Sequence, residues 1–245
     1  LKSYPMVERY GAVWIWMGDP TKADAGTIPD FSHIDSPKRR SVKGGHHVNC
    51  NYMMMVENLM DLGHIIFLHS QTGGLENLVL SESKTGNENG TITDQRLYQD
   101  IATPNLFANH MDVTRCDFWT DIRWNAPSAI RNHAGAAPRG FARGDRSTDQ
   151  LGSHFLTPET HDTTHYFYAH SRNYALDDEA GDEIWRHWQR TALKAEDSMV
   201  AEAIQGVVPQ AEELGVEMIV LSTDLSGIRV NRILEEMAQA EESDG

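Results

Sequence analysis

The C-terminal two-thirds of the chain contains short runs of residues that predict a meander of strands. Four runs alternate between apolar and polar positions or are rich in aromatic residues, at 118–124, 128–132, 152–158 and 165–171. A period of two is typical of strands that bury one face. Because short polar turns separate the runs, the sequence favours antiparallel pairing.

The N-terminal half also contains strand and turn residues. Segment 10–20 is rich in β-branched and aromatic residues and ends in Gly-Asp-Pro, so it predicts one strand, and a second short strand is expected over 41–51. Segment 70–100 is rich in Gly, Asn, Ser and Thr and is interpreted either as a mobile lid beside a site or as an ordinary hairpin and loop. Asn89-Gly90 is a type I′ turn signal, which indicates a hairpin.

Two helices are predicted towards the C-terminus. Over 177–206 apolar residues recur mostly every three to five positions after an acidic first turn, and a second helix is expected over 227–240. A curved antiparallel sheet that grips a long helix, with a cavity between them, is the natural arrangement for this order of elements. The predicted fold class is therefore α+β with a helix-grip architecture.

Composition narrows the class of protein. The 245 residues suffice for one large domain or two small ones, and the net charge of −15 disfavours nucleic acid and anionic membranes as partners. Two cysteines without a Cys-x2-Cys pair exclude a thiolate zinc site and an all-cysteine iron–sulfur cluster within this chain. With no long apolar run and no leader sequence, the chain is expected to be soluble and cytoplasmic. A start at Leu1 without an initiator Met suggests a piece of a longer polypeptide.

The stretch 57–69 places polar residues inside an otherwise apolar run. Asp61, His64 and His69 would be costly to bury unless each found a partner, and a metal ion is one such partner. At about 100° per residue, Asp61 and His64 can share a helix face, whereas His64 and His69 are about 140° apart. Both histidines can bind one ion only if the helix departs from ideal geometry, for which Gly63 is a plausible place.

The chemistry of this stretch leaves alternatives open. Two neutral imidazoles with one distant carboxylate would form the triad of a non-haem Fe(II) oxygenase, which keeps positions free for dioxygen. A zinc hydrolase is disfavoured because no Glu adjoins the first histidine as a general base, as it does in His-Glu-x2-His. The other alternative is a helix-grip carrier of an apolar ligand, in which the histidines are core residues that bond to the backbone or to water.

Two motifs together carry a family resemblance. Asn-x2-Asp-x2-His-x4-His at 58–69, followed by Ala-Glu-Asp-Ser-Met-Val-Ala-Glu-Ala at 195–203, resembles the catalytic domain of Rieske non-haem iron oxygenases. The closer similarity is to single-component oxygenases of the vanillate O-demethylase and dicamba monooxygenase type. Residues 4–20 are similar to the strand that closes the Rieske domain in that group, and 152–160 extend the match. The resemblance covers essentially the whole chain.

The resemblance implies a role for each motif residue. A mononuclear Fe(II) would be bound by His64, His69 and Asp197, with Glu196 as the rival of Asp197 for the third position. Asp61 would be a bridging carboxylate that accepts a hydrogen bond from His64 and, across a subunit boundary of a homotrimer, from a cluster-binding histidine of the neighbouring protomer. Asn58 would lie near the iron.

The resemblance also implies substrate contacts. These would come from His154, Trp188 and Asn132, with His133 as the alternative to Asn132 beside a substrate carboxylate or ether oxygen. Most other histidines are interpreted as structural or exposed: His46, His47, His161, His165 and His170.

One part of the family pattern is missing. A Rieske cluster needs Cys-x-His and Cys-x2-His, and neither motif occurs in this chain. Residues 1–25 are therefore interpreted as remnant strands that close a missing Rieske domain, and 26–245 as the mononuclear iron catalytic domain. A [2Fe-2S] cluster would belong to the full-length protein, and without it the chain should bind iron but receive no electrons.

The expected function is that of an oxygenase component that uses Fe(II) and dioxygen to oxidise a small aromatic substrate. O-demethylation of a methoxy-aromatic acid is the most specific expectation, with a ferredoxin or reductase as electron donor. Ring dihydroxylation and methyl hydroxylation of an aryl sulfonate would use the same ligand set and stay open as alternatives.

Overall fold

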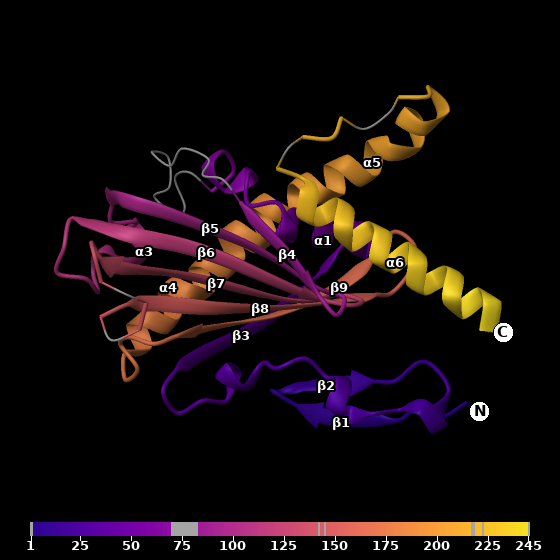
Figure 1. Ribbon diagram of the computed structural model, residues 1–245, viewed down its shortest axis with the longest axis horizontal. Coiled ribbons are helices and arrows are strands. Elements are labelled where there is room, and N and C mark those ends of the chain that lie inside the picture. Colours follow the sequence, from indigo (N-terminus) through magenta and orange to yellow (C-terminus); the bar gives the residue numbers. More distant parts are fainter. Residues whose placement is uncertain are drawn as a thin grey trace.

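A seven-stranded antiparallel sheet forms the centre of the computed structural model, which describes residues 2–69, 83–141, 143–144, 146–216, 219–221 and 223–244 (Figure 1). The strand order is β3-β9-β8-β7-β6-β5-β4. The strands are β3 (Arg40–Val48), β4 (Lys84–Glu88), β5 (Thr91–Ala102), β6 (Arg115–Asn125), β7 (Ala129–Pro138), β8 (Thr148–Pro158) and β9 (Thr164–Arg172). The four predicted runs lie in β6 to β9, which pair consecutively, so the predicted meander is confirmed.

The predicted hairpin at Asn89-Gly90 joins β4 to β5. Both turn residues have positive φ, 50° for Asn89 and 78° for Gly90, as a type I′ turn requires. The prediction of a hairpin is therefore confirmed for this part of segment 70–100. The lid interpretation concerns mainly 70–82, which lie outside the described residues.

A second hairpin confirms one strand within 10–20 but shortens it to Ala12–Ile15, because residues 10 and 11 form a turn. Strands β1 (Met6–Arg9) and β2 (Ala12–Ile15) pair across a turn at Tyr10 and Gly11, whose φ values are 60° and 69°. The turn was hidden because Tyr10 is a good strand residue that here takes a left-handed conformation. Three short 3-10 turns follow: η1 (Pro20–Lys22), η2 (Ala25–Thr27) and η3 (Ser32–Ile34).

The helices lie on one side of the sheet, and the β1–β2 hairpin lies on the other (Figure 1). They are α1 (Tyr52–Met60), η4 (His64–Ile66), α3 (Asn105–Ala108), α4 (Glu179–Trp188), η5 (Gln189–Ser198), α5 (Met199–Glu213) and α6 (Leu225–Asp244). The predicted helix over 177–206 is continuous through α4, η5 and α5, but its middle third is a π-helix. No helix among the described residues is both long enough and apolar enough to cross a membrane.

The main apolar core fills the space between the sheet and these helices. Trp124, Ile130 and Leu156 from the strands pack with Met55 of α1 and Val230 of α6, and all five are buried. Burying each such side chain contributes about 1.5–3 kcal/mol. A smaller aromatic cluster on the other face joins Trp14 and Phe31 to Phe155 of β8. A sheet that grips a long helix confirms the predicted helix-grip α+β fold.

An ion-pair cluster fastens the start of the long helix to the sheet. The carboxylate of Asp182 in α4 accepts hydrogen bonds from the guanidinium of Arg40 at 2.7 and 2.8 Å and pairs with that of Arg172 at 2.7 Å. Arg172 is 1% exposed, so its charge depends on this carboxylate and on nearby backbone carbonyls. The hydrogen bond from Arg40 lowers the pKa of Asp182.

We predict that Asp182→Ala lowers the free energy of unfolding by about 3 kcal/mol, because it leaves a buried guanidinium without its counter-charge. Chemical denaturation at neutral pH would measure the loss. Because the folded-state pKa lies below the ordinary 3.8, the stabilisation is present above that pH and disappears as the pH falls through the lowered value. Glu183→Ala is the matched control, since Glu183 is 66% exposed and pairs with Arg186. Equal stability of the two variants would contradict the anchoring role.

Candidate metal centre

A break in the helical backbone presents His64 and His69. Helix α1 begins at Tyr52, where the Asn51 side chain accepts from Met53 N, and ends at Met60. Asp61 is extended, and its carboxylate accepts from Gly63 N at 2.6 Å. The tight turn η4 then carries His64, and His69 follows three residues after its end, with His69 N bonded to Ile65 O at 3.2 Å. The predicted departure at Gly63 thus occurs three residues earlier, where α1 ends.

The π-helical segment η5 presents Asp197. Ser198 Oγ donates to Leu193 O at 2.7 Å, five residues back, and lies 2.8 Å from His46 Nε2 on β3. Segments of π-helix occur frequently at functional sites, because the wider turn changes which side chains share a face. Here Glu196 and Asp197 both contact His69, although neighbours on an ideal α-helix would point about 100° apart.

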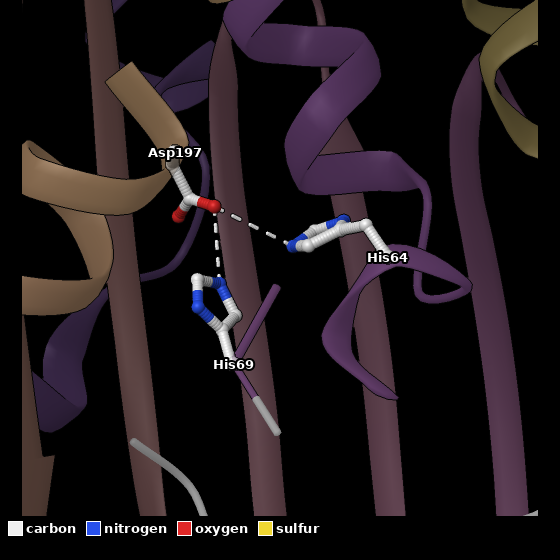
Figure 2. Close-up of side chains that lie close together, drawn as sticks. All are labelled: His64, His69 and Asp197. Carbon is white, nitrogen blue, oxygen red and sulfur yellow. Dashed lines mark ion pairs between the residues drawn. The ribbon is translucent and has the colours of Figure 1, made fainter. Parts of the chain in front are cut away.

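Figure 2 shows the side chains of His64 and His69 converging on the carboxylate of Asp197. Asp197 Oδ1 lies 3.0 Å from His69 Nε2 and 3.6 Å from His64 Nε2, and one ligand atom from each residue lies within 4.8 Å of the others. His69 and Asp197 are 5% and 2% exposed. Donor atoms bound to one metal at about 2.1 Å lie at most about 4.2 Å apart. The three side chains could therefore hold a divalent metal after a small adjustment.

The electrostatics of the cluster favour a positive charge between these groups. Burial lowers the pKa of His64, so this imidazole is neutral and free to act as a ligand. Burial also acts to lower the pKa of His69, but the hydrogen bonds and charges of Asp197 and Glu196 outweigh it and raise the pKa. A buried carboxylate beside two imidazoles is stabilised by a cation, either a proton or a metal ion.

Each imidazole has a carboxylate on its other side. His69 Nδ1 lies 2.7 Å from Glu196 Oε2, a hydrogen bond that sequence reasoning did not anticipate. His64 Nδ1 lies 3.9 Å from Asp61 Oδ2, which is beyond hydrogen-bonding distance, and it has no other hydrogen-bond partner among the described residues. Asn58 Nδ2 donates to Asp197 Oδ1 at 3.4 Å. Asp61 thus lies beside His64, and Asn58 lies beside the triad.

A cavity adjoins the triad between the sheet and the helices. Its volume is about 100 Å³, and it is partly open to solvent. All three residues expected to contact substrate line it: Asn132, His154 and Trp188. His133 lies instead on the opposite face of β7, near Trp119 and Asp149.

Sequence reasoning missed other cavity residues. His170, interpreted as structural, lines the cavity, where its ring stacks on Trp185 and its Nδ1 lies 3.1 Å from Gln189 Nε2. Thr120 and Gln150 also line the cavity, and their positions within strands carried no signal that could have assigned them to it.

Comparison with known proteins decides the family. The profile of the vanillate O-demethylase oxygenase C-terminal domain matches residues 48–240. The chain belongs to this family. The dicamba O-demethylase oxygenase component of Stenotrophomonas maltophilia is 39% identical, over 98% of this chain and 71% of that protein. The toluene-4-sulfonate monooxygenase iron-sulfur subunit of Comamonas testosteroni is 33% identical over the same shares.

Solved structures of this oxygenase family show the same fold. Dicamba monooxygenase bound to 3,6-dichlorosalicylic acid has a TM-score of 0.91 and 38% identity, covering 98% of this chain and 71% of that one. A second structure, with non-heme iron and dicamba, has a TM-score of 0.85 and 38% identity, covering 99% and 70%. The family resemblance read from the motifs, the helix-grip fold and the assignment to oxygenase components of this type are confirmed.

Proposed function

We propose that this chain is the catalytic part of a cytoplasmic oxygenase that binds one Fe(II) through His64, His69 and Asp197 and oxidises an aromatic substrate with dioxygen. The convergence of two Nε2 atoms on one buried Asp197 oxygen carries the proposal. Two imidazoles and one carboxylate are the donor set of non-haem Fe(II) oxygenases. The similar dicamba monooxygenase has been solved with non-heme iron, which supports the choice of metal.

The proposed reaction is the oxidative O-demethylation of a methoxy-aromatic acid. One dioxygen, two electrons, two protons and the methyl ether give a phenol, formaldehyde and water. Bound Fe(II) would supply the activation of dioxygen. The chain's own residues orient the substrate: Trp188 lies against the ring of His69, while Asn132 and His154 line the sheet side of the cavity. The toluene-4-sulfonate relative favours methyl hydroxylation as the second candidate.

The proposed electron route passes through Asp61. Its carboxylate is about one-third exposed and lies on the Nδ1 side of His64, so a donor from another subunit can approach it. We infer that a Rieske cluster of a neighbouring protomer in a homotrimer occupies that side, supplied in turn by a ferredoxin or reductase. Closing the 3.9 Å gap between Asp61 and His64 would give His64 Nδ1 its missing partner.

Metal content tests the proposed ligands directly. We predict about one iron per chain after anaerobic reconstitution with Fe(II), and its loss in both His64→Ala and Asp197→Ala, as measured by elemental analysis. His47→Ala is the matched control, because His47 lies at the surface beside Glu159. Wild-type protein that takes up no iron would instead support a non-catalytic carrier. The reaction is then tested by measuring formaldehyde release from methoxybenzoates, with a Rieske domain restored to the chain and a ferredoxin or reductase added as electron donor.

Glu196 is proposed to orient His69 without binding the metal. Hydrogen bonds of this kind fix the tautomer of a ligand histidine, and their removal typically costs 10–100-fold in metal affinity or activity. We predict that Glu196→Ala weakens Fe(II) binding by about tenfold. Glu196→Gln keeps a hydrogen bond with His69 Nδ1, so its Fe(II) affinity should fall by less. Competition with a chelator would measure both. Complete loss of iron in Glu196→Ala would make Glu196 the ligand, and unchanged affinity would remove its orienting role.

Asp61→Asn separates electron delivery from metal binding. In a protein with the Rieske domain restored and an electron donor added, we predict that this variant keeps its iron and that its turnover rate falls more than about tenfold. The bridging charge is removed, but no proposed ligand changes. Single-turnover reduction of the iron site, followed spectroscopically, would locate the defect in electron transfer. Normal turnover in the variant would exclude Asp61 from the route.

A further inference from the structure

Three polar side chains on the sheet floor of the cavity have unsatisfied oxygen atoms. Thr120 Oγ1, Asn132 Oδ1 and Gln150 Oε1 are buried and have no hydrogen-bond partner among the described residues. Thr120 and Gln150 are only 4% and 6% exposed. Leaving a buried polar group unpaired costs about 1–3 kcal/mol, so three such groups around one cavity indicate a place where water or a polar group of a ligand pairs with them.

The strand register brings these groups together. Ala134 on β7 lies between Thr120 on β6 and Gln150 on β8, because it pairs with both. Asn132 is two residues from Ala134 and therefore points to the same face. The residue that pairs with Asn132 is Gly152 on β8, where an added Cβ atom would lie 2.8 Å from His154 Nε2. Two small residues, Ala134 and Gly152, thus leave the floor open between the polar side chains.

Within this floor, Thr120 and Gln150 lie further from the triad than Asn132 does. Ser198, next to Asp197, contacts His46, which pairs with Tyr166 on β9. The Tyr166 hydroxyl lies 2.7 Å from His154 Nδ1, so His154 marks the triad end of β8. Gln150 is four residues further along this strand, a separation of roughly 13 Å at about 3.3 Å per residue. A ring with its reacting carbon at the triad would direct its remote substituents towards Thr120 and Gln150.

The floor carries no positive charge. No Lys or Arg is among the described residues that line the cavity. Burial lowers the pKa of His170 to about 3 and holds that of His154 well below its usual value, so both imidazoles are neutral. An anionic substituent on the floor would lose its hydration without meeting a cation, whereas a hydroxyl is uncharged and has a proton to donate to one of the unpaired oxygens.

We propose that Thr120 and Gln150 form a subsite for an uncharged substituent that donates a hydrogen bond, a hydroxyl, on the part of the aromatic substrate remote from the reacting carbon. The inference rests on the proposed function for the position of that carbon. Thr120 and Gln150 thereby determine specificity, and the carboxylate of the proposed acid substrate would lie away from this subsite, beside Asn132 and His154.

Ligand binding tests the subsite without turnover. We would measure dissociation constants by calorimetry on the iron-reconstituted chain under argon, with 4-methoxyphenol, 4-methoxytoluene and 4-methoxybenzoate as probes. The first two have nearly the same shape and differ in one hydroxyl. We expect 4-methoxyphenol to bind about tenfold more tightly than 4-methoxytoluene, and 4-methoxybenzoate to bind more weakly than the phenol.

The variants Thr120→Val and Gln150→Leu should each raise the dissociation constant of 4-methoxyphenol by about tenfold. The dissociation constant of 4-methoxytoluene should change by less than about twofold. Thr157→Val is the matched control, because Thr157 lies on the same strand as Gln150 but is exposed. Equal affinity for the two neutral probes, or a preference that survives both substitutions, would overturn the subsite. Tighter binding of 4-methoxybenzoate than of the phenol would overturn its restriction to uncharged groups.

The same samples separate this inference from the proposed function. Iron content is measured on each preparation, so absence of iron contradicts the oxygenase site whatever the probes show. If iron is bound and the hydroxyl preference is absent, only the subsite fails. Circular dichroism of each variant confirms that it is folded before its affinity is compared.

Discussion

A buried carboxylate facing two imidazoles is the constraint on which the rest of this structure depends. Asp197 is 2% exposed and lies about 130 residues from His64 and His69 in the sequence, so the fold must bring an interior negative charge to a defined place. Desolvation makes such a charge expensive unless a cation or several hydrogen bonds compensate it. Asn58, His64 and His69 contact Asp197 Oδ1. The site is thus arranged for one more positive charge.

The surrounding architecture serves to hold these groups at fixed positions. Asp197 lies on a helix that is tied to the sheet through Asp182 at its start, through Gln189, whose Nε2 donates to Val42 O, and through the contact between Ser198 and His46 beside the site. The two histidines lie on a separate short turn whose entry is set by Asp61 and Gly63. The proposed metal-binding residues therefore come from η5 and from residues 64–69, and the sheet supplies the opposite wall of the cavity.

The local sequence pointed to His64 and His69, whereas the family resemblance selected Asp197 over Glu196 as the third residue. Polar residues inside an apolar run attract notice, and the motif around Asp197 lies on a strongly periodic helix. Reasoning from an ideal α-helix also required Glu196 and Asp197 to compete, with only one facing the site. The π-helical geometry of η5 removes this conflict, since both carboxylates contact His69 on different ring atoms. The turn at Tyr10 was missed because strand propensity outweighed a single glycine. Thr120 and Gln150 could not be assigned, because only the register across three strands brings them to one cavity.

The proposed ligands and the polar floor of the cavity lie on different parts of the fold, and this separation affects specificity. The proposed ligands and the carboxylates beside them lie on η5 and on residues 61–69 after α1, whereas the polar floor lies on β6, β7 and β8. Side chains on a strand alternate between faces, so a substitution at 120, 134 or 150 changes the cavity without moving the backbone that holds the triad. A fold of this kind can therefore change the substituents it accepts while it keeps its metal chemistry. Relatives whose names refer to dicamba and to toluene-4-sulfonate are consistent with such a separation.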